Sequence, residues 1–226
     1  GGKAAHLNSV NLALDGTIKD MAFSGKSFFE VKGISYADYN VPRLNSSSII
    51  NYRKNLITIK DMKIETEDLK SSVSQINIKM PEKKAGYALK IIDMNTLYPE
   101  KKAEVKNFDL YMNLSTGKES ILGDFSFSTR KVMFQGITSG KISGSGRFDE
   151  KAFFVDIPGA EISGGRINLA AMGKTSKGPF PVKIKATAEN IDLGVISRAA
   201  SKFSEFPYII SGDVKNAAFD GTVNSV

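Results

Sequence analysis

Apolar and polar residues alternate along most of this chain, in short runs that end at Gly, Asn, Asp or Ser. Successive side chains of a β-strand point to opposite faces, so an alternation of period two predicts strands with one apolar face. Examples are Val10, Leu12 and Leu14 early in the sequence and Val182 with Ile184 late in it. The pattern predicts an all-β protein.

One segment departs from this period. Leu193, Ile196 and Phe203 follow one another at helical spacing, and Asp192 before them is a typical N-cap residue. The sequence therefore predicts one short amphipathic helix, near residues 192–203, in an otherwise β-rich chain.

The composition argues against most enzyme classes. The chain has no Cys, which removes disulfides, thiolate nucleophiles and Cys-ligated metals, and it has a single His, His6. Trp, the usual stacking platform for sugar rings, is also absent. No window approaches the roughly 18 consecutive apolar residues of a membrane helix. We expect no catalysis, no cofactor and no metal site.

The net charge of +7, from 31 Lys and Arg against 24 Asp and Glu, makes an anionic partner worth considering. Only six of these cations are Arg, and they are scattered along the sequence. Nucleic-acid recognition favours clustered Arg interleaved with aromatic residues, so we expect no nucleic-acid partner.

Glycine-containing segments offer motifs that fail on inspection. Asn168–Thr175 resembles a phosphate-binding loop, but its first Gly is missing and the Pro-containing sequence that follows cannot begin the required helix. Gly144 and Gly146 lack the β-α-β context of a dinucleotide site. We interpret these segments as turns, bulges or close strand contacts.

The apolar strand faces allow two interpretations. They form either the closed core of a β-sandwich, or the concave face of an open, curved sheet that acyl chains complete. Alternation alone does not separate the two. The candidate groove residues are Ile76, Ile78, Met80, Phe108, Leu110, Met112, Leu114, Phe125, Phe127, Val132, Phe134, Phe153, Val155, Ile157, Val182 and Ile184.

The two ends of the chain contain similar decapeptides. Residues 16–25 and 212–221 share Gly, Lys, Ala, Phe and Gly at identical places, which favours a repeated β unit. No stretch has the length of a linker. We expect one β-rich segment over residues 1–226 that belongs to a larger protein, with a possible subdivision near residues 81–104.

The shared motif Gly-x-Val/Ile-Lys-x-x-Ala-Phe-x-Gly, the strand at residues 164–171 and the Glu-Asn-Ile-Asp-Leu of residues 189–193 resemble AsmA-like and TamB-like bacterial envelope proteins. The resemblance is best over residues 140–226. It implies a periplasmic protein, tethered to a membrane by a segment outside this chain. It also implies a long half-open sheet, a β-taco, whose hydrophobic groove carries phospholipids between the inner and outer membranes without catalysis.

Two further expectations follow from this resemblance. Lysines in two Pro-led connectors are candidates for contact with anionic lipid headgroups; they are Lys83, Lys84, Lys101 and Lys102. The sheet edges of such a segment are expected to pair with the rest of the protein or with another copy. The alternative function is a non-catalytic structural or adhesive β-repeat module of a cell-surface protein.

Overall fold

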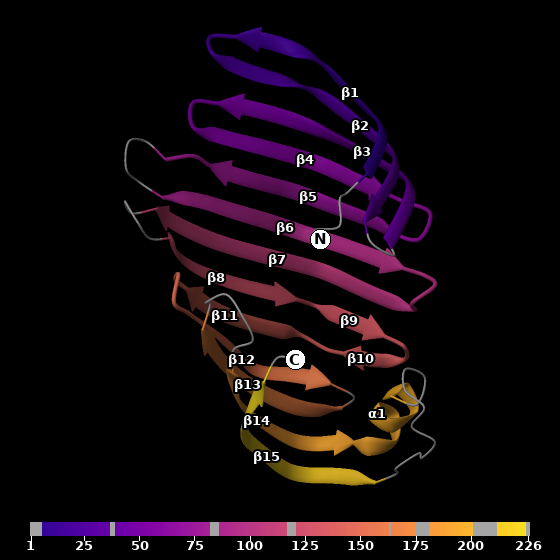
Figure 1. Cartoon of the computed structure of the whole chain (residues 1–226), viewed down its shortest axis with the longest axis vertical. Coiled ribbons are helices and arrows are strands. Elements are labelled where there is room, and N and C mark those ends of the chain that lie inside the picture. Colours follow the sequence, from indigo (N-terminus) through magenta and orange to yellow (C-terminus); the bar gives the residue numbers. More distant parts are fainter. Residues whose placement is uncertain are drawn as a thin grey trace.

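The computed structural model describes residues 6–36, 39–81, 86–116, 121–162, 164–174, 181–200 and 212–224. These residues form one antiparallel sheet of fifteen strands and one short helix (Figure 1). The sheet is elongated and curved, with β1 at one end and β15 at the other. This confirms the predicted fold class.

The bounds of the elements are β1 (His6–Lys19), β2 (Ala22–Tyr36), β3 (Tyr39–Arg53), β4 (Leu56–Glu65), β5 (Lys70–Lys79), β6 (Tyr87–Tyr98), β7 (Ala103–Thr116), β8 (Ile121–Thr129), β9 (Lys131–Phe134), β10 (Ile137–Ser139), β11 (Ile142–Phe148), β12 (Ala152–Ile162), β13 (Gly165–Lys174), β14 (Pro181–Asp192), α1 (Leu193–Ala200) and β15 (Asp213–Asn224). From β1 to β8 and from β11 to β15, neighbours in sequence are neighbours in the sheet. The sheet is continuous through residues 81–104, because β6 pairs with both β5 and β7.

The strand register gathers the alternating apolar residues on one side of the sheet, here called the apolar face. Directly opposed residues form a ladder that crosses every strand of the main path. Its members are Ile18, Phe23, Tyr52, Ile57, Ile78, Leu89, Met112, Phe125, Gly146, Val155, Ala171, Ile184 and Gly221. A simple period-two pattern in each strand therefore becomes one continuous apolar surface.

Irregular positions in the long strands keep this surface continuous. Asp93 and Asn107 adopt left-handed backbone angles, with φ of 53° and 51°, and the β6–β7 register shifts beside them. Met94, three residues after Ile91, pairs with Phe108. An extra residue in a strand restores the same face on both sides of the insertion, so the apolar face continues past the bulge.

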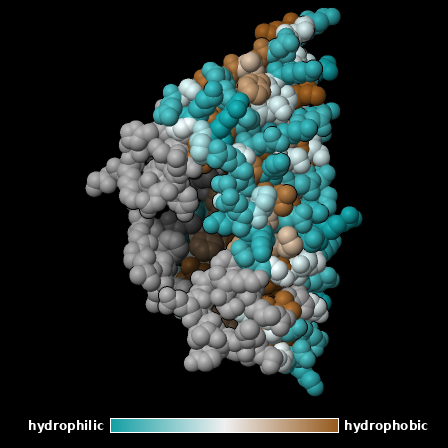
Figure 2. Space-filling view, turned by 90° about the vertical axis from the view of Figure 1, so that its right-hand side faces the viewer, coloured by the Kyte–Doolittle hydropathy of each residue, from teal (hydrophilic) through white to brown (hydrophobic). Residues whose placement is uncertain are grey.

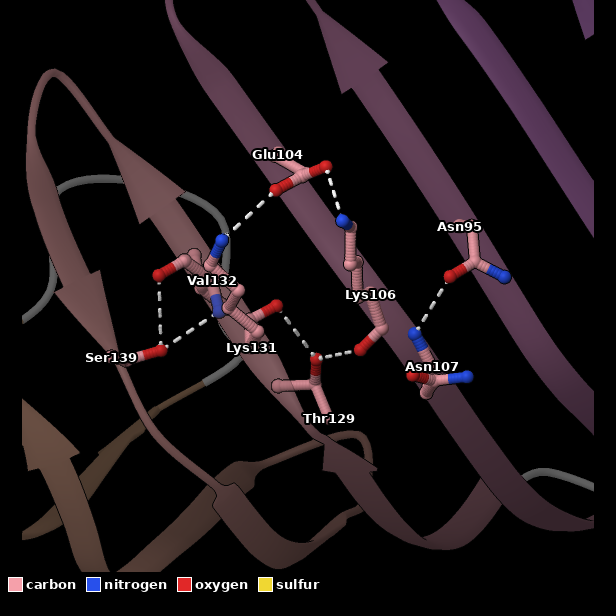
Figure 3. Close-up of polar contacts among 8 residues, drawn as sticks. All are labelled: Asn95, Glu104, Lys106, Asn107, Thr129, Lys131, Val132 and Ser139. Atoms are coloured by element: carbon pink, nitrogen blue, oxygen red, sulfur yellow. Dashed lines mark hydrogen bonds and ion pairs between the residues drawn. The ribbon is translucent and has the colours of Figure 1, made fainter.

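Polar contacts attach the short strands β9 and β10 to the main sheet (Figure 3). The Glu104 carboxylate on β7 lies 2.9 Å from Lys106 Nζ and 3.3 Å from Lys131 Nζ on β9. The hydrogen bond from Lys106 contributes most to holding the pKa of Glu104 below its ordinary value. Ser139 Oγ on β10 accepts a hydrogen bond from Val132 N at 2.8 Å. These contacts hold the segment between β8 and β11, which forms β9 and β10, in place beside the main sheet.

The described residues have no closed core. No large side chain among them is fully buried, and the buried apolar residues are Val31, Val73, Ala160 and Ile191. All described strands belong to one sheet, so no second sheet packs on the apolar face. The β-sandwich interpretation therefore does not apply to this part of the chain.

The predicted helix forms, with the expected cap. Asp192 Oδ1 accepts hydrogen bonds from Gly194 N at 2.7 Å and Val195 N at 3.2 Å. The described helix ends at Ala200, whereas the prediction extended to residue 203, which lies outside the described residues.

The prediction of a repeated β unit is wrong. Residues 16–25 cross the β1–β2 turn, whereas residues 213–221 lie within the single strand β15. The same motif therefore adopts two conformations, because the turn residues Asp20 and Met21 have positive φ and their counterparts in β15 do not.

Candidate functional site

The sixteen candidate groove residues lie together. The register places fifteen of them on the apolar face, from Ile76 and Ile78 on β5 to Val182 and Ile184 on β14. Met80, the sixteenth, directly follows β5. The face also includes residues outside the candidate set, among them Ile50 and Phe23. The same alternation in β1, β2 and β3 could have identified them.

Two glycines in the middle of the apolar face leave room for aromatic rings of the neighbouring strand. Gly144 and Gly146 on β11 are directly opposite Phe127 and Phe125 on β8. A Cβ atom at Gly144 would lie 2.7 Å from Cζ of Phe127, so the aromatic ring occupies the space above the glycine backbone. The expectation of close strand contacts at these glycines is thus confirmed.

The apolar face is open to a ligand over much of its area. Most of its side chains are half-buried rather than buried. In the space-filling view, hydrophobic atoms lie inside a hollow, while hydrophilic residues predominate on the surface beside it (Figure 2). A contiguous exposed apolar surface of this kind is typical of a binding site.

A cavity of about 1310 Å³ lies at the end of the sheet where β6 begins and β7 ends. Its lining includes residues of both faces, for example Leu114 and Phe153 from the apolar face and Asn113 and Phe154 from the other. Of the candidate groove residues, Met80, Leu114 and Phe153 line it and the other thirteen do not. The volume exceeds the range typical of small-ligand pockets.

The cavity is rich in cations and aromatic rings. Four cationic side chains and two carboxylates line it; they are Lys79, Arg147, Lys174 and Lys183, with Asp124 and Asp149. The guanidinium of Arg147 lies 5.9 Å from the centre of the Phe154 ring, a cation–π contact. Asp124 accepts a hydrogen bond from Asn113 at 3.0 Å. The excess of cations suits a ligand with an anionic group.

The lysines proposed from the sequence lie elsewhere. Lys101 and Lys102 are exposed in the β6–β7 turn, at the opposite end of β6 from the cavity. The Lys101 carbonyl accepts a hydrogen bond from Gln135 Nε2 at 2.7 Å, and Lys102 N donates one to the Pro99 carbonyl at 2.9 Å. Lys83 and Lys84 lie outside the described residues. The cations of the cavity were missed because they come from different strands.

Within the described ranges, no helix is long and apolar enough to cross a membrane, and no group of three His, Asp or Glu side chains could hold a metal ion. No protein-family model, curated protein or solved structure matches the chain. The resemblance to AsmA-like and TamB-like proteins stays a prediction from the sequence motifs.

Proposed function

We propose that this chain binds the acyl chains of phospholipids along its apolar face, as one segment of an AsmA-like protein in the bacterial periplasm. In that role it provides part of a hydrophobic path between the inner and outer membranes. One observation carries the proposal: an apolar ladder crosses the whole main path of the sheet, and no second sheet covers it among the described residues.

The dimensions of the face suit this ligand. Adjacent strands lie about 4.8 Å apart, so the thirteen strands of the main path extend the apolar surface over roughly 58 Å. The hydrocarbon core of a bilayer is about 30 Å thick, and one leaflet accounts for about half of that. The face is therefore long enough for several acyl chains in succession.

The energetics also support acyl chains. Each CH₂ group removed from water contributes about 0.8 kcal/mol, and a half-open face offers this gain at every position along it. Most side chains on the face are aliphatic or aromatic, so an acyl chain could move along it. Among the hydroxyls on this face, those of Ser27 and Ser48 lie 2.7 Å apart and those of Ser71 and Thr96 lie 2.9 Å apart, and each pair is hydrogen-bonded.

The cation-rich cavity supports a ligand with an anionic headgroup. Arg147 and Lys183 lie on the face opposite to the apolar ladder, at the same end of the sheet as Leu114. A lipid at this end could contact cations with its headgroup while its chains extend onto the apolar face. Each such cation contributes on the order of 1 kcal/mol near an anionic lipid surface.

Photo-crosslinking at adjacent residues tests the proposal. A photoreactive amino acid is placed at Leu110 or Phe127 on the apolar face, and at Ser126 or Ser128, the neighbours of Phe127 on the opposite face and away from the cavity. After purification from a bacterial envelope fraction, irradiation should yield phospholipid adducts at Leu110 and Phe127, identified by mass spectrometry. The matched positions on the opposite face should yield few.

Adducts at neither Leu110 nor Phe127, or equal adducts on both faces, would refute the proposal. Substitution to aspartate gives a second readout, because Leu110→Asp should lower the amount of co-purified phospholipid several-fold while Ser126→Asp leaves it unchanged. A lipid-free wild-type protein would instead favour the structural or adhesive module.

A further inference from the structure

The cavity has apolar side chains of its own on the face opposite to the apolar face. The exposed fraction is 44% for Tyr111, 51% for Leu122 and 49% for Met172. Leu114 and Phe153, which belong to the apolar face, line the same cavity. Apolar side chains of both faces therefore meet around the strand ends, beside the cationic residues. Such a lining suits a ligand that is itself partly apolar and partly anionic.

The strand register arranges the cations across the cavity. One row of directly opposed residues on the opposite face consists of Lys79, Ala88, Asn113, Asp124, Arg147, Phe154, Met172 and Lys183. Arg147 and Lys183 are three strands apart, about 14 Å along the sheet, with Phe154 and Met172 between them. Lys174 lies diagonally across from Lys183, within reach of a long side chain. Three cations thus lie beside two apolar side chains.

These cations are available to an anionic ligand. Lys79, Lys174 and Lys183 are exposed and form no ion pair in the described part of the chain. The guanidinium of Arg147 lies over the Phe154 ring. A guanidinium in this position still has N–H groups that can donate hydrogen bonds to a phosphate.

The two carboxylates of the cavity, in contrast, already have partners within the protein. Asp149 accepts hydrogen bonds from Lys151 N and Ala152 N, both at 2.7 Å, and these bonds hold its pKa below the ordinary value. Asp124 accepts a hydrogen bond from Asn113 at 3.0 Å. A cationic group on a ligand would therefore compete with the protein for both carboxylates.

We propose that this cavity selects phospholipids whose headgroup has a net negative charge over zwitterionic phospholipids. The inference rests on the proposed function, because it places the acyl chains of the same lipid on the apolar face. Both kinds of headgroup bring a phosphate that the cations can bind. The ammonium of a zwitterionic headgroup would in addition face four cationic side chains, with Asp124 and Asp149 already engaged. Discrimination thus comes from repulsion of the wrong headgroup as well as attraction of the right one.

Vesicles that contain equal amounts of phosphatidylglycerol and phosphatidylethanolamine, with identical acyl chains, provide the test. After incubation, the protein is separated from the vesicles and its bound lipids are quantified by mass spectrometry. We expect about a five-fold excess of phosphatidylglycerol on the wild type, the effect of one additional charge contact. Combining Arg147→Gln with Lys183→Gln should remove this excess. The matched control combines Lys90→Gln with Lys185→Gln, which removes the same charge from the same face outside the cavity and should preserve the excess.

Equal binding of the two lipids by the wild type would overturn this inference. The proposed function would still stand if Leu110→Asp lowered the total bound lipid, whereas a wild type that binds neither lipid would overturn both. An excess that the control variant also loses would show that overall charge, not the cavity, selects the lipid. Glycerol phosphate, which has no acyl chains, should not displace the lipid at equal concentration; displacement would assign the cavity to a free anion instead. If the double variant loses its circular dichroism strand signal, Lys183→Gln alone should still lower the excess, and an unchanged excess would overturn the inference.

Discussion

Replacing Gly146 by Ala should lower the stability of the sheet measurably. A Cβ atom at this position would lie 2.6 Å from the backbone oxygen of Phe154 and closer still to the ring of Phe125. Ordinary van der Waals contacts are 3.4–4 Å. The ring can rotate, but the carbonyl moves only if β12 moves with it. Overpacking of this kind costs about 1–3 kcal/mol.

We expect a cost in the upper half of that range, about 2–3 kcal/mol, because a ring and a backbone group must both shift. For a chain of this size, that corresponds to a fall in Tm of roughly 4–12 °C, measured by circular dichroism. A second variant separates the two contacts. In a Phe125→Leu background the ring is gone, so Gly146→Ala should cost about 0.5–1 kcal/mol less than in the wild type.

The matched control is Ser145→Ala, which changes the adjacent exposed residue on the opposite face and should stay within about 0.5 kcal/mol of wild type. If Gly146→Ala is equally harmless, the packing of phenylalanine over glycine does not limit this strand. An equal cost of Gly146→Ala with and without the Phe125 ring would show that the ring is not involved.

Three further variants test local features by urea or thermal unfolding. Met21→Gly should stabilise the chain by about 0.5–1 kcal/mol, because Met21 is 89% exposed at φ 58°, where glycine avoids steric cost; an unchanged midpoint would contradict this. A hydrogen bond from Asn95 contributes most to lowering the pKa of Asp93 in the folded state, so its stabilisation is present above about pH 4 and lost as the pH falls through the folded pKa. Asp93→Asn should therefore reduce the fall in Tm between pH 7 and pH 3, and an identical fall would refute that role. Asp192→Ala removes the cap that accepts from Gly194 N and should cost about 1 kcal/mol, whereas Asp192→Asn should cost less.

Much of this architecture follows from alternation in the sequence. Phe125 and Phe127 on β8 and Leu110 and Met112 on β7 could be assigned to one face within each strand, because side-chain direction repeats every two residues. That these two faces coincide depends on register, which turns and bulges determine. The sequence pattern therefore predicted the members of the face, while their order across the sheet needed the structure.

The bulges show where the period-two rule is insufficient. Ile91 and Met94 are three residues apart and share a face, which strict alternation forbids. The left-handed backbone at Asp93 resolves the conflict. Asp and Asn tolerate this conformation better than most residues, but they are also common in turns, so their presence in the sequence does not identify a bulge.

The cavity could not be predicted for a different reason. Arg147 lies on β11 and Lys183 on β14, and the distance between them in sequence carries no signal of their proximity. The lysines proposed from the sequence, by contrast, belong to two local Pro-Glu-Lys-Lys-Ala sequences, at residues 81–85 and 99–103. Lys101 and Lys102, however, lie at the other end of β6. A site built from strand ends depends on the order of strands in the sheet, which a local pattern does not encode.

The half-exposed apolar face has one physical cause. In a single-layer sheet each interior strand contacts its two neighbours, so apolar side chains stay half-exposed. Acyl chains that cover the face would bind the folded sheet and not the unfolded chain, so phospholipid should raise the Tm. Leu110→Asp should therefore reduce both the bound phospholipid and this rise in Tm, whereas Ser126→Asp on the opposite face should leave both unchanged. If added phospholipid raised the Tm of Leu110→Asp and of the wild type equally, acyl chains would not lie on this face.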